Sequence, residues 1–152
     1  MTAPVRLAVL GDPLRYTRSP DLHRAGAAAL GIACESPAIR TPLADLAVTL
    51  ERLETTGYTG CNLTMPLKES ALACVRGATP RARRARSVNT LTFSNSGREG
   101  DTTDGVGFVD LLGSLNRDVA ASRIVLLGAG GAARSLALAV RDAGGGTVHV
   151  VS

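Results

Sequence analysis

The stretch IVLLGAGGAARSLALAV, residues 124–140, decides the fold of this chain. It begins with a run of apolar residues, passes through Gly128, Gly130 and Ala133 in the spacing G-x-G-x-x-A, and continues as an Ala-rich segment typical of a helix. Gly128 permits a tight turn, Gly130 lets a pyrophosphate approach the backbone, and the small Ala133 allows strand and helix to pack closely. This order predicts a strand, a dinucleotide-binding turn and a helix.

A β-α-β unit is expected around this turn, with strands over 123–127 and 147–151 and a helix over 132–143. Amide groups at the start of such a helix face an anion, so the turn residues are the candidate cofactor contacts. They are Gly128, Ala129, Gly130, Gly131, Ala132 and Ala133. The residue that separates NAD from NADP follows the second strand, beyond Ser152, so the turn leaves the cofactor open. A plain tight turn between strand and helix is the alternative.

Upstream of the turn, strand-like and helix-like segments alternate. Strands are expected over residues 5–10, 33–39, 58–63 and 88–93. Three of the expected helices have a start signal before a proline: one begins with Ser19 as N-cap before Pro20 and ends at Gly31, one begins at Thr41 and Pro42 and ends at Gly57, and one begins at Thr79 and Pro80 and runs to residue 86. Two more helices are expected over 66–75 and 106–115. Such alternation favours an α/β fold with a mostly parallel sheet. We place a domain boundary near residue 104, with a substrate domain over 1–104 and only the beginning of a Rossmann-type dinucleotide-binding domain over 105–152.

The composition is that of a globular α/β protein. Hydrophobic residues make up 45% and aromatic residues 3%, so Ala, Val, Leu and Ile must build the core. Cys34, Cys61 and Cys74 are odd in number and lack metal-ligand spacing, which favours small buried apolar side chains and no metal site. No stretch approaches the roughly 18 apolar residues of a membrane span, and residues 1–9 lack a leader pattern. We therefore expect a cytoplasmic protein without a membrane partner.

The net charge of +4 is a modest excess that suits anionic small molecules as well as nucleic acid. The basic run RARRAR, residues 81–86, alternates with Ala and lacks aromatic residues, so we interpret it as a solvated helix face and expect no nucleic-acid partner. Lys68 is the sole lysine of the chain. Lys, unlike Arg, can release its proton near neutral pH in suitable surroundings, so Lys68 is the candidate acid/base residue.

Four polar clusters lie at the predicted carboxyl ends of strands or just after them, at residues 16–19, 62–68, 89–90 and 102–104. Ligands of open α/β sheets bind at this edge. Hydroxyl and amide side chains suit a small polyhydroxy ligand whose carboxylate is held by hydroxyls and backbone donors. Each cluster alone is typical of a cap or a turn. Together with the lone lysine and the glycine turn, they predict a substrate site.

The sequence resembles the shikimate dehydrogenase family across almost the whole chain. The motifs that carry the resemblance, in the family's order and spacing, are GDPLRYTRSPDLH, GCNLTMPLK, SVNTL, GDTTDGVGF and LLGAGGAARS. The resemblance implies an oxidoreductase that uses NADP to reduce 3-dehydroshikimate reversibly to shikimate, a step of aromatic amino-acid (chorismate) biosynthesis. It implies a small-molecule substrate and a monomer or homodimer.

The resemblance also assigns roles to single residues. The implied substrate contacts are Thr17 and Ser19 for the carboxylate, then Asn62, Thr64, Lys68, Asn89 and Asp104. Lys68 and Asp104 are the implied catalytic pair. In this chemistry Lys68 exchanges a proton with the reacting oxygen, while Asp104 orients Lys68 and bonds the neighbouring hydroxyl.

Several residues depart from the family pattern. Thr17 stands where the family usually has Ser, Tyr16 where His is common, and Thr102 where Asn is usual. Arg86 and Ser87 replace a small Gly-Ala pair. These departures leave quinate, or a related cyclohexane carboxylate, open as the substrate. The family also continues with the rest of the nucleotide domain, so a truncated, non-catalytic substrate-binding fragment is the second alternative.

Overall fold

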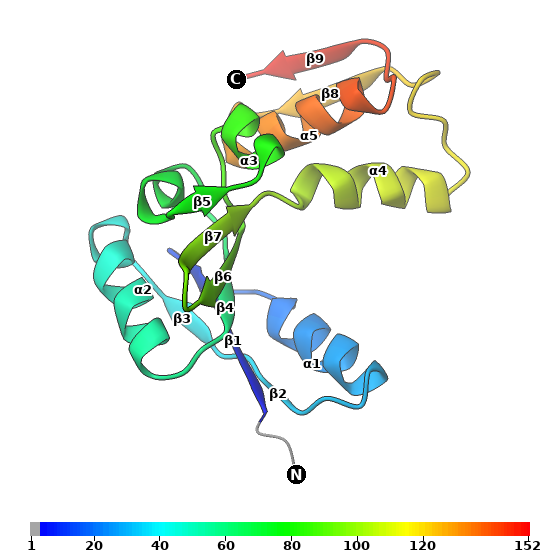
Figure 1. Cartoon of the computed structure of the whole chain (residues 1–152). Coiled ribbons are helices and arrows are strands. Elements are labelled where there is room, and N and C mark those ends of the chain that lie inside the picture. Colours follow the sequence, from blue (N-terminus) through cyan, green and yellow to red (C-terminus); the bar gives the residue numbers. More distant parts are fainter. Residues whose placement is uncertain (1–3) are drawn as a thin grey trace.

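The computed structural model describes residues 4–152, which form a larger sheet flanked by helices and a smaller sheet beside it (Figure 1). The larger sheet has seven strands in the order β2-β1-β4-β6-β7-β5, with β3 also paired to β1. Its strands are β1 Val5–Gly11, β2 Cys34–Glu35, β3 Ala38–Arg40, β4 Gly60–Leu63, β5 Gly77–Ala78, β6 Thr90–Ser94 and β7 Gly97–Asp101. Across residues 4–152, no helix is long and apolar enough to cross a membrane.

Strand β1 is central to this sheet, which explains its continuous apolar run. It pairs in parallel with β2, β3 and β4. Ala8, Val9 and Leu10 are all buried, because neighbouring strands and helices cover both faces. The hairpin of β6 and β7 extends the sheet in antiparallel fashion from β4. The sheet is therefore mainly parallel on one side of β4 and mixed on the other, and the expected α/β class is confirmed.

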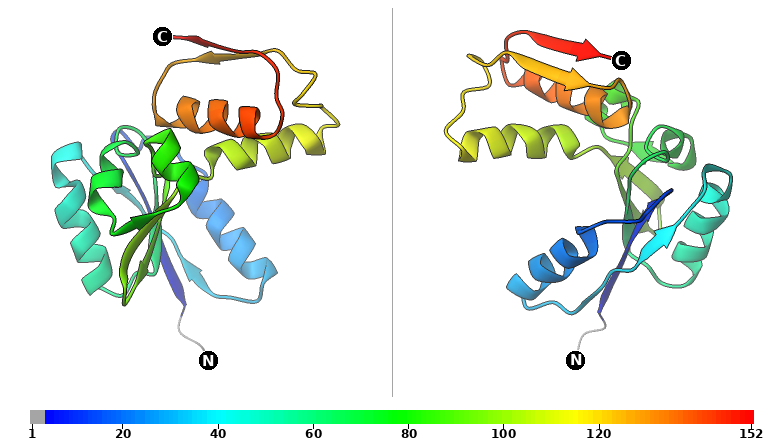
Figure 2. Two further views of the ribbon diagram at one scale, coloured as in Figure 1. Left: turned by 45° about the horizontal axis from the view of Figure 1, so that its top comes forward. Right: turned by 180° about the vertical axis from the view of Figure 1, so that it is seen from behind.

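The helices lie on both sides of the larger sheet and beside the smaller one. They are α1 Ser19–Ala29, α2 Leu46–Thr55, α3 Pro80–Ala85, α4 Asp104–Ser114 and α5 Gly131–Asp142, with short 3-10 helices η1 Leu43–Asp45 and η2 Ser70–Cys74. Figures 1 and 2 show α1 and α2 on opposite faces of the sheet. Leu50 and Leu53 of α2 are buried in the core cluster, whereas no residue of the described helix α1 is fully buried.

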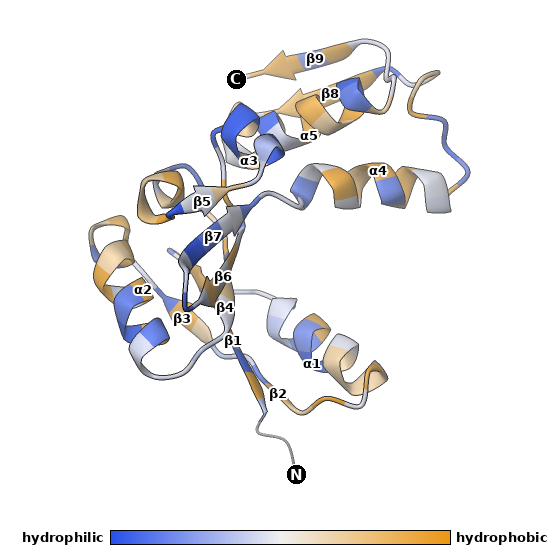
Figure 3. Cartoon of the chain, viewed as in Figure 1, coloured by the Kyte–Doolittle hydropathy of each residue, from blue (hydrophilic) through white to orange (hydrophobic). Residues whose placement is uncertain are grey.

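The smaller sheet confirms the predicted β-α-β unit. Strands β8 Ile124–Leu127 and β9 Val148–Val151 pair in parallel, and α5 connects them. Figure 3 shows apolar residues along both strands. Half or more of the surface of Val125, Leu127 and Val151 is exposed, so one face of this sheet remains open to solvent. The predicted boundary near residue 104 coincides with the start of α4 and stays a prediction as a domain boundary.

Three local predictions were wrong. The strand expected over 33–39 is divided into β2 and β3, because Pro37, which has no backbone N–H to donate, lies between them. The helix expected over 66–75 is a turn followed by η2, because the Lys68 carbonyl accepts from the Val88 amide at 2.8 Å and leaves the helical pattern. Arg18, rather than Ser19, occupies the N-cap of α1.

The cysteines are only partly as expected. Cys61 is buried, and desolvation raises the pKa of its thiol to about 12, so it packs as a small apolar group. Cys34 and Cys74 are half-buried and free. They are more exposed than expected, because Cys34 lies in the edge strand β2 and Cys74 lies at the end of the 3-10 helix η2.

The basic run lies on α3, as predicted, except for Arg86, which follows the helix as its C-cap. The Thr79 hydroxyl caps this helix by accepting from the Ala82 amide at 3.3 Å. Arg81 donates from Nε to Asp101 Oδ1 at 2.7 Å, and Arg84 donates to both carboxylate oxygens of Asp142. These arginines therefore hold acidic side chains of β7 and α5.

The start of α5 also lies close to two segments that border the larger sheet, the turn after β4 and the residues after α3. A Cβ added at Gly131 would lie 2.5 Å from Ser87 Oγ and 3.2 Å from the Cβ of Lys68. Ser87 is completely buried, and its hydroxyl has no hydrogen-bond partner among residues 4–152. The glycine at the start of α5 thus permits an approach that any side chain would prevent.

We expect Asp101 to support stability down to low pH. The Arg81 guanidinium, with help from the Thr79 hydroxyl and the Thr102 amide, lowers the pKa of Asp101 from 3.8 to about 2. A lowered folded-state pKa stabilises the fold above the unfolded value, and this contribution, about 2 kcal/mol, disappears as pH falls from about 4 to about 2. Asp101→Asn should lower the free energy of unfolding at pH 7 by about this amount and flatten its pH dependence in that window.

Urea unfolding at several pH values measures this free energy. Asp110→Asn, at an exposed position of α4, is the matched control and should leave the pH dependence unchanged. An Asp101→Asn curve that runs parallel to wild type between pH 4 and pH 2 contradicts the expectation.

Replacing Ser87 should stabilise the protein. Its buried hydroxyl is desolvated without compensation, so Ser87→Ala should raise the free energy of unfolding by roughly 1 kcal/mol. Ser36→Ala is the control, because Ser36 is also buried but its hydroxyl lies 2.8 Å from His23 Nδ1. Chemical denaturation should show opposite signs for the two variants, and a similar loss in both would refute this account.

Candidate active site

The fold brings all of the predicted substrate contacts to one cavity of about 360 Å³. Those lining it are Thr17, Ser19, Asn62, Thr64, Lys68, Asn89 and Asp104. Strands β1 and β4 are parallel, so the segments that follow them leave from the same edge of the sheet. The antiparallel hairpin begins and ends at that edge, because Thr90 pairs with both Asn62 and Asp101. Residues far apart in sequence therefore meet there, although their roles stay predictions.

Lys68 and Asp104 form an ion pair inside this cavity. Lys68 Nζ donates to Asp104 Oδ2 at 2.7 Å. The two side chains are 17% and 22% exposed, so water reaches both but screens the pair only partly. The only lysine of the chain is therefore held beside a carboxylate at the ligand-facing edge of the sheet.

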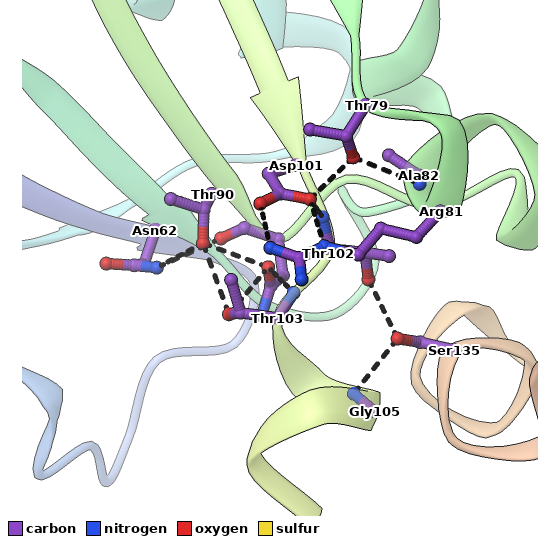
Figure 4. A network of polar contacts seen from close by, with 11 residues as sticks. Asn62, Thr79, Arg81, Ala82, Thr90, Asp101, Thr102, Thr103, Gly105 and Ser135 are labelled. Atoms are coloured by element: carbon purple, nitrogen blue, oxygen red, sulfur yellow. Dashed lines mark hydrogen bonds and ion pairs between the residues drawn. The ribbon is translucent and has the colours of Figure 1, made fainter. Parts of the chain in front are cut away.

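Asn89 orients the carboxylate from the other side. Its Nδ2 donates to Asp104 Oδ1 at 2.7 Å, and its Oδ1 accepts from the Thr103 amide at 2.9 Å. Asn62 Nδ2 donates to the Asn89 carbonyl at 3.2 Å. It also donates to the Thr90 hydroxyl at 3.1 Å (Figure 4). The amides and hydroxyls of three segments thus form one network that leaves Asp104 little freedom to turn.

The opposite wall comes from the loop after β1 and from α1. Thr17 Oγ1 accepts from the Ser19 amide at 3.3 Å, which sets the two hydroxyl residues side by side. Tyr16 also lines the cavity, yet 99% of it is exposed. His23 lines the wall and was not predicted from the sequence. Its spacing of four residues from Ser19 on a helix is the signal that identifies it in retrospect.

A second cavity of about 420 Å³ opens at the glycine turn. Gly128, Gly130, Gly131, Ala132 and Ala133 contribute to its wall, and the remaining candidate, Ala129, lies outside that lining in the described chain. Gly128 has a φ of 103°, which L side chains rarely adopt. A turn of this shape ahead of a helix fits the pyrophosphate of a dinucleotide.

Lys68 lies between the two cavities. Thr64, Met65 and Lys68 line both of them. Glu69, the next residue, lines the glycine-turn cavity and pairs with Arg134 of α5 at 2.8 Å. Sequence reasoning missed this pair, because the two residues belong to different elements and no spacing connects them. A group bound at the glycine turn would therefore share a wall with a ligand in the first cavity.

Comparison with known proteins identifies relatives for this chain. The family model described as the shikimate dehydrogenase substrate binding domain matches residues 9–91. Curated proteins named shikimate dehydrogenase (NADP(+)) from Xanthomonas euvesicatoria and Methylobacillus flagellatus are 43% and 42% identical to it. The matches cover 91% and 86% of this chain, which spans about half the length of these relatives (50% and 49%).

A solved structure agrees. The shikimate 5-dehydrogenase of Thermus thermophilus, in complex with NADP(H) and shikimate, is 38% identical and superimposes with a TM-score of 0.88 over 96% of this chain and 55% of that one. The family model covers more than half of the 152 residues, and the cavity lies within the same fold. The chain therefore belongs to the shikimate dehydrogenase family, as its motifs had indicated.

Proposed function

We propose that this chain carries the substrate site and the first part of the cofactor site of an NADP-dependent shikimate dehydrogenase, which reversibly reduces 3-dehydroshikimate to shikimate. The observation that carries the proposal is the position of Lys68, paired with Asp104 in one cavity and lining the next. A residue at that place can exchange a proton with a substrate oxygen close to a bound nicotinamide.

The cavity wall suits the substrate's functional groups. The hydroxyls of Thr17 and Ser19 are donors for the carboxylate, at the end of the cavity formed by the β1 loop. At the other end, the amides of Asn62 and Asn89 and the carboxylate of Asp104 match ring hydroxyls. Polar groups at both ends would fix the ring in one orientation, with its reacting carbon toward the shared wall.

The residues of the glycine turn would hold the dinucleotide, whose nicotinamide would supply a hydride in one direction and accept it in the other. When the ring ketone is reduced, its oxygen gains negative charge and needs a proton. The Lys68 ammonium can donate that proton, and neutral Lys68 can accept it in the reverse reaction. Asp104 holds Lys68 Nζ through Oδ2 and can accept a hydrogen bond from the substrate hydroxyl next to the reacting carbon. An arginine at this place would keep the charge but retain its proton.

NADP, rather than NAD, is proposed because the curated relatives carry NADP in their names and the Thermus structure contains it. The glycine turn fits either dinucleotide, since both contain the same pyrophosphate.

The choice of ring substrate depends in part on Thr17, which has one methyl group more than the family's usual Ser. One methyl group contributes only about 1 kcal/mol to discrimination between ring substrates.

Lys68→Arg should keep the charge in the cavity and lose at least about 100-fold in turnover, because it removes the proton exchange. The measurement is shikimate-dependent reduction of NADP by the purified native protein and by its Lys68→Arg variant. Calorimetry follows shikimate binding to both. Arg24→Lys, a swap of the same two residue types in an exposed ion pair of α1, is the control and should retain full activity.

A fully active Lys68→Arg variant would overturn the role of Lys68. Turnover with quinate but not shikimate, or with NAD but not NADP, would replace the substrate or the cofactor and keep the reaction type. Shikimate binding without turnover by the wild-type protein would favour the substrate-binding fragment.

A further inference from the structure

Helix α4 begins at Asp104 but is not capped by its own N-cap residue. The first amides of a helix have no partner within the helix and need an outside acceptor. The usual acceptor is the N-cap side chain, here Thr103, which makes no capping bond to any described residue. The Thr103 hydroxyl instead accepts from Asn89 Nδ2 at 3.1 Å, as part of the network around the carboxylate. The free backbone amides at the start of α4 therefore need an acceptor from another element.

Ser135 of α5 supplies the missing acceptor. Its Oγ accepts from the Gly105 amide at 3.0 Å and from the Thr102 hydroxyl at 3.0 Å (Figure 4). Thr102 and Ser135 are 2% and 4% exposed, so water competes little for these bonds. Thr102 and Gly105 lie on either side of Asp104 in the chain. One hydroxyl of α5 thus binds the Thr102 side chain on one side of Asp104 and the Gly105 backbone amide on the other.

The two helices touch at this point. A Cβ added at Gly105 would overlap the Ser135 carbonyl and lie 2.7 Å from the Cβ of Ala139. The backbone of α4 therefore rests directly on α5. Because interiors are close-packed, a shift of α5 would displace the start of α4, and Asp104 with it.

The same face of α5 touches the other partner of the ion pair. Gly131 precedes Ser135 by four residues, so the two lie one above the other on the helix. Gly131 lies against Ser87 and the Cβ of Lys68. A single face of one helix thus contacts Lys68 directly and Asp104 through its neighbours, and this helix begins at the glycine turn.

We propose that Ser135 is a positioning residue, which caps α4 from α5 and so keeps Asp104 within bonding distance of Lys68. The catalytic meaning of that pair rests on the proposed function. Without the Ser135 hydroxyl, the buried Gly105 amide loses its acceptor. The usual acceptor at this position is the hydroxyl of the N-cap residue Thr103, which would have to leave Asn89. The Asn89 network and the ion pair would then loosen together.

The single lysine makes this testable in the 152-residue chain. Labelling with ¹⁵N-lysine gives one ammonium signal, from Lys68, whose hydrogen exchange with water reports how firmly the ion pair is closed. Ser135→Ala should speed this exchange by about tenfold and move the signal. Ser114→Ala is the matched control, because its hydroxyl bonds the Leu111 carbonyl at the other end of α4. It should leave the signal unchanged.

Ser135→Cys guards against a variant that fails to fold, because the thiol, which is slightly larger than the hydroxyl, leaves no cavity and is only a weak acceptor. It should change the Lys68 signal in the same direction, by less. An unchanged signal in a folded Ser135 variant that is less stable to urea would overturn the proposal, because Ser135 would then be only structural. The readout needs neither substrate nor nucleotide. If the signal responds as expected and the native protein shows no turnover, the proposed function fails and the positioning role stands.

Discussion

The ion pair between Lys68 and Asp104 is the interaction on which the rest of this structure depends. Its two members come from segments 36 residues apart, and each is placed by a different part of the fold. Lys68 lies in the turn after strand β4, where its own carbonyl accepts from the Val88 amide. Asp104 stands where the antiparallel hairpin ends and α4 begins. A half-buried pair requires this precision, because a charge left without its partner there would be costly.

The sequence predicted those features that depend on local rules. The turn at Gly128 was predictable because a positive φ before a helix requires glycine, and α3 because Thr79 and Pro80 are standard starting residues. The cavity residues were predictable because polar clusters at strand ends converge in an open sheet. The roles predicted for them rest on family resemblance, apart from that of Lys68, which was a candidate because it is the sole lysine.

Tertiary contacts decided what the sequence did not predict. The segment after Pro66 has a helix-like composition, but the Val88 amide captures the Lys68 carbonyl and prevents the helix. The sequence pattern does not predict that Ser135 accepts hydrogen bonds from the start of a neighbouring helix. Hydrophobic periodicity indicates which residues are buried, but not which residues they bond to. Gly105 lies just before the helix expected over 106–115, and no pattern in the sequence indicates that its backbone rests on α5.

The wall shared by the two cavities has a consequence for thermodynamics. Thr64, Met65 and Lys68 face both spaces, so a molecule in one of them changes the surface offered to a molecule in the other. Any such influence must be mutual, since the free energy of filling both sites does not depend on the order of filling. Two ligands that contact the same three side chains would therefore raise or lower each other's affinity by the same factor.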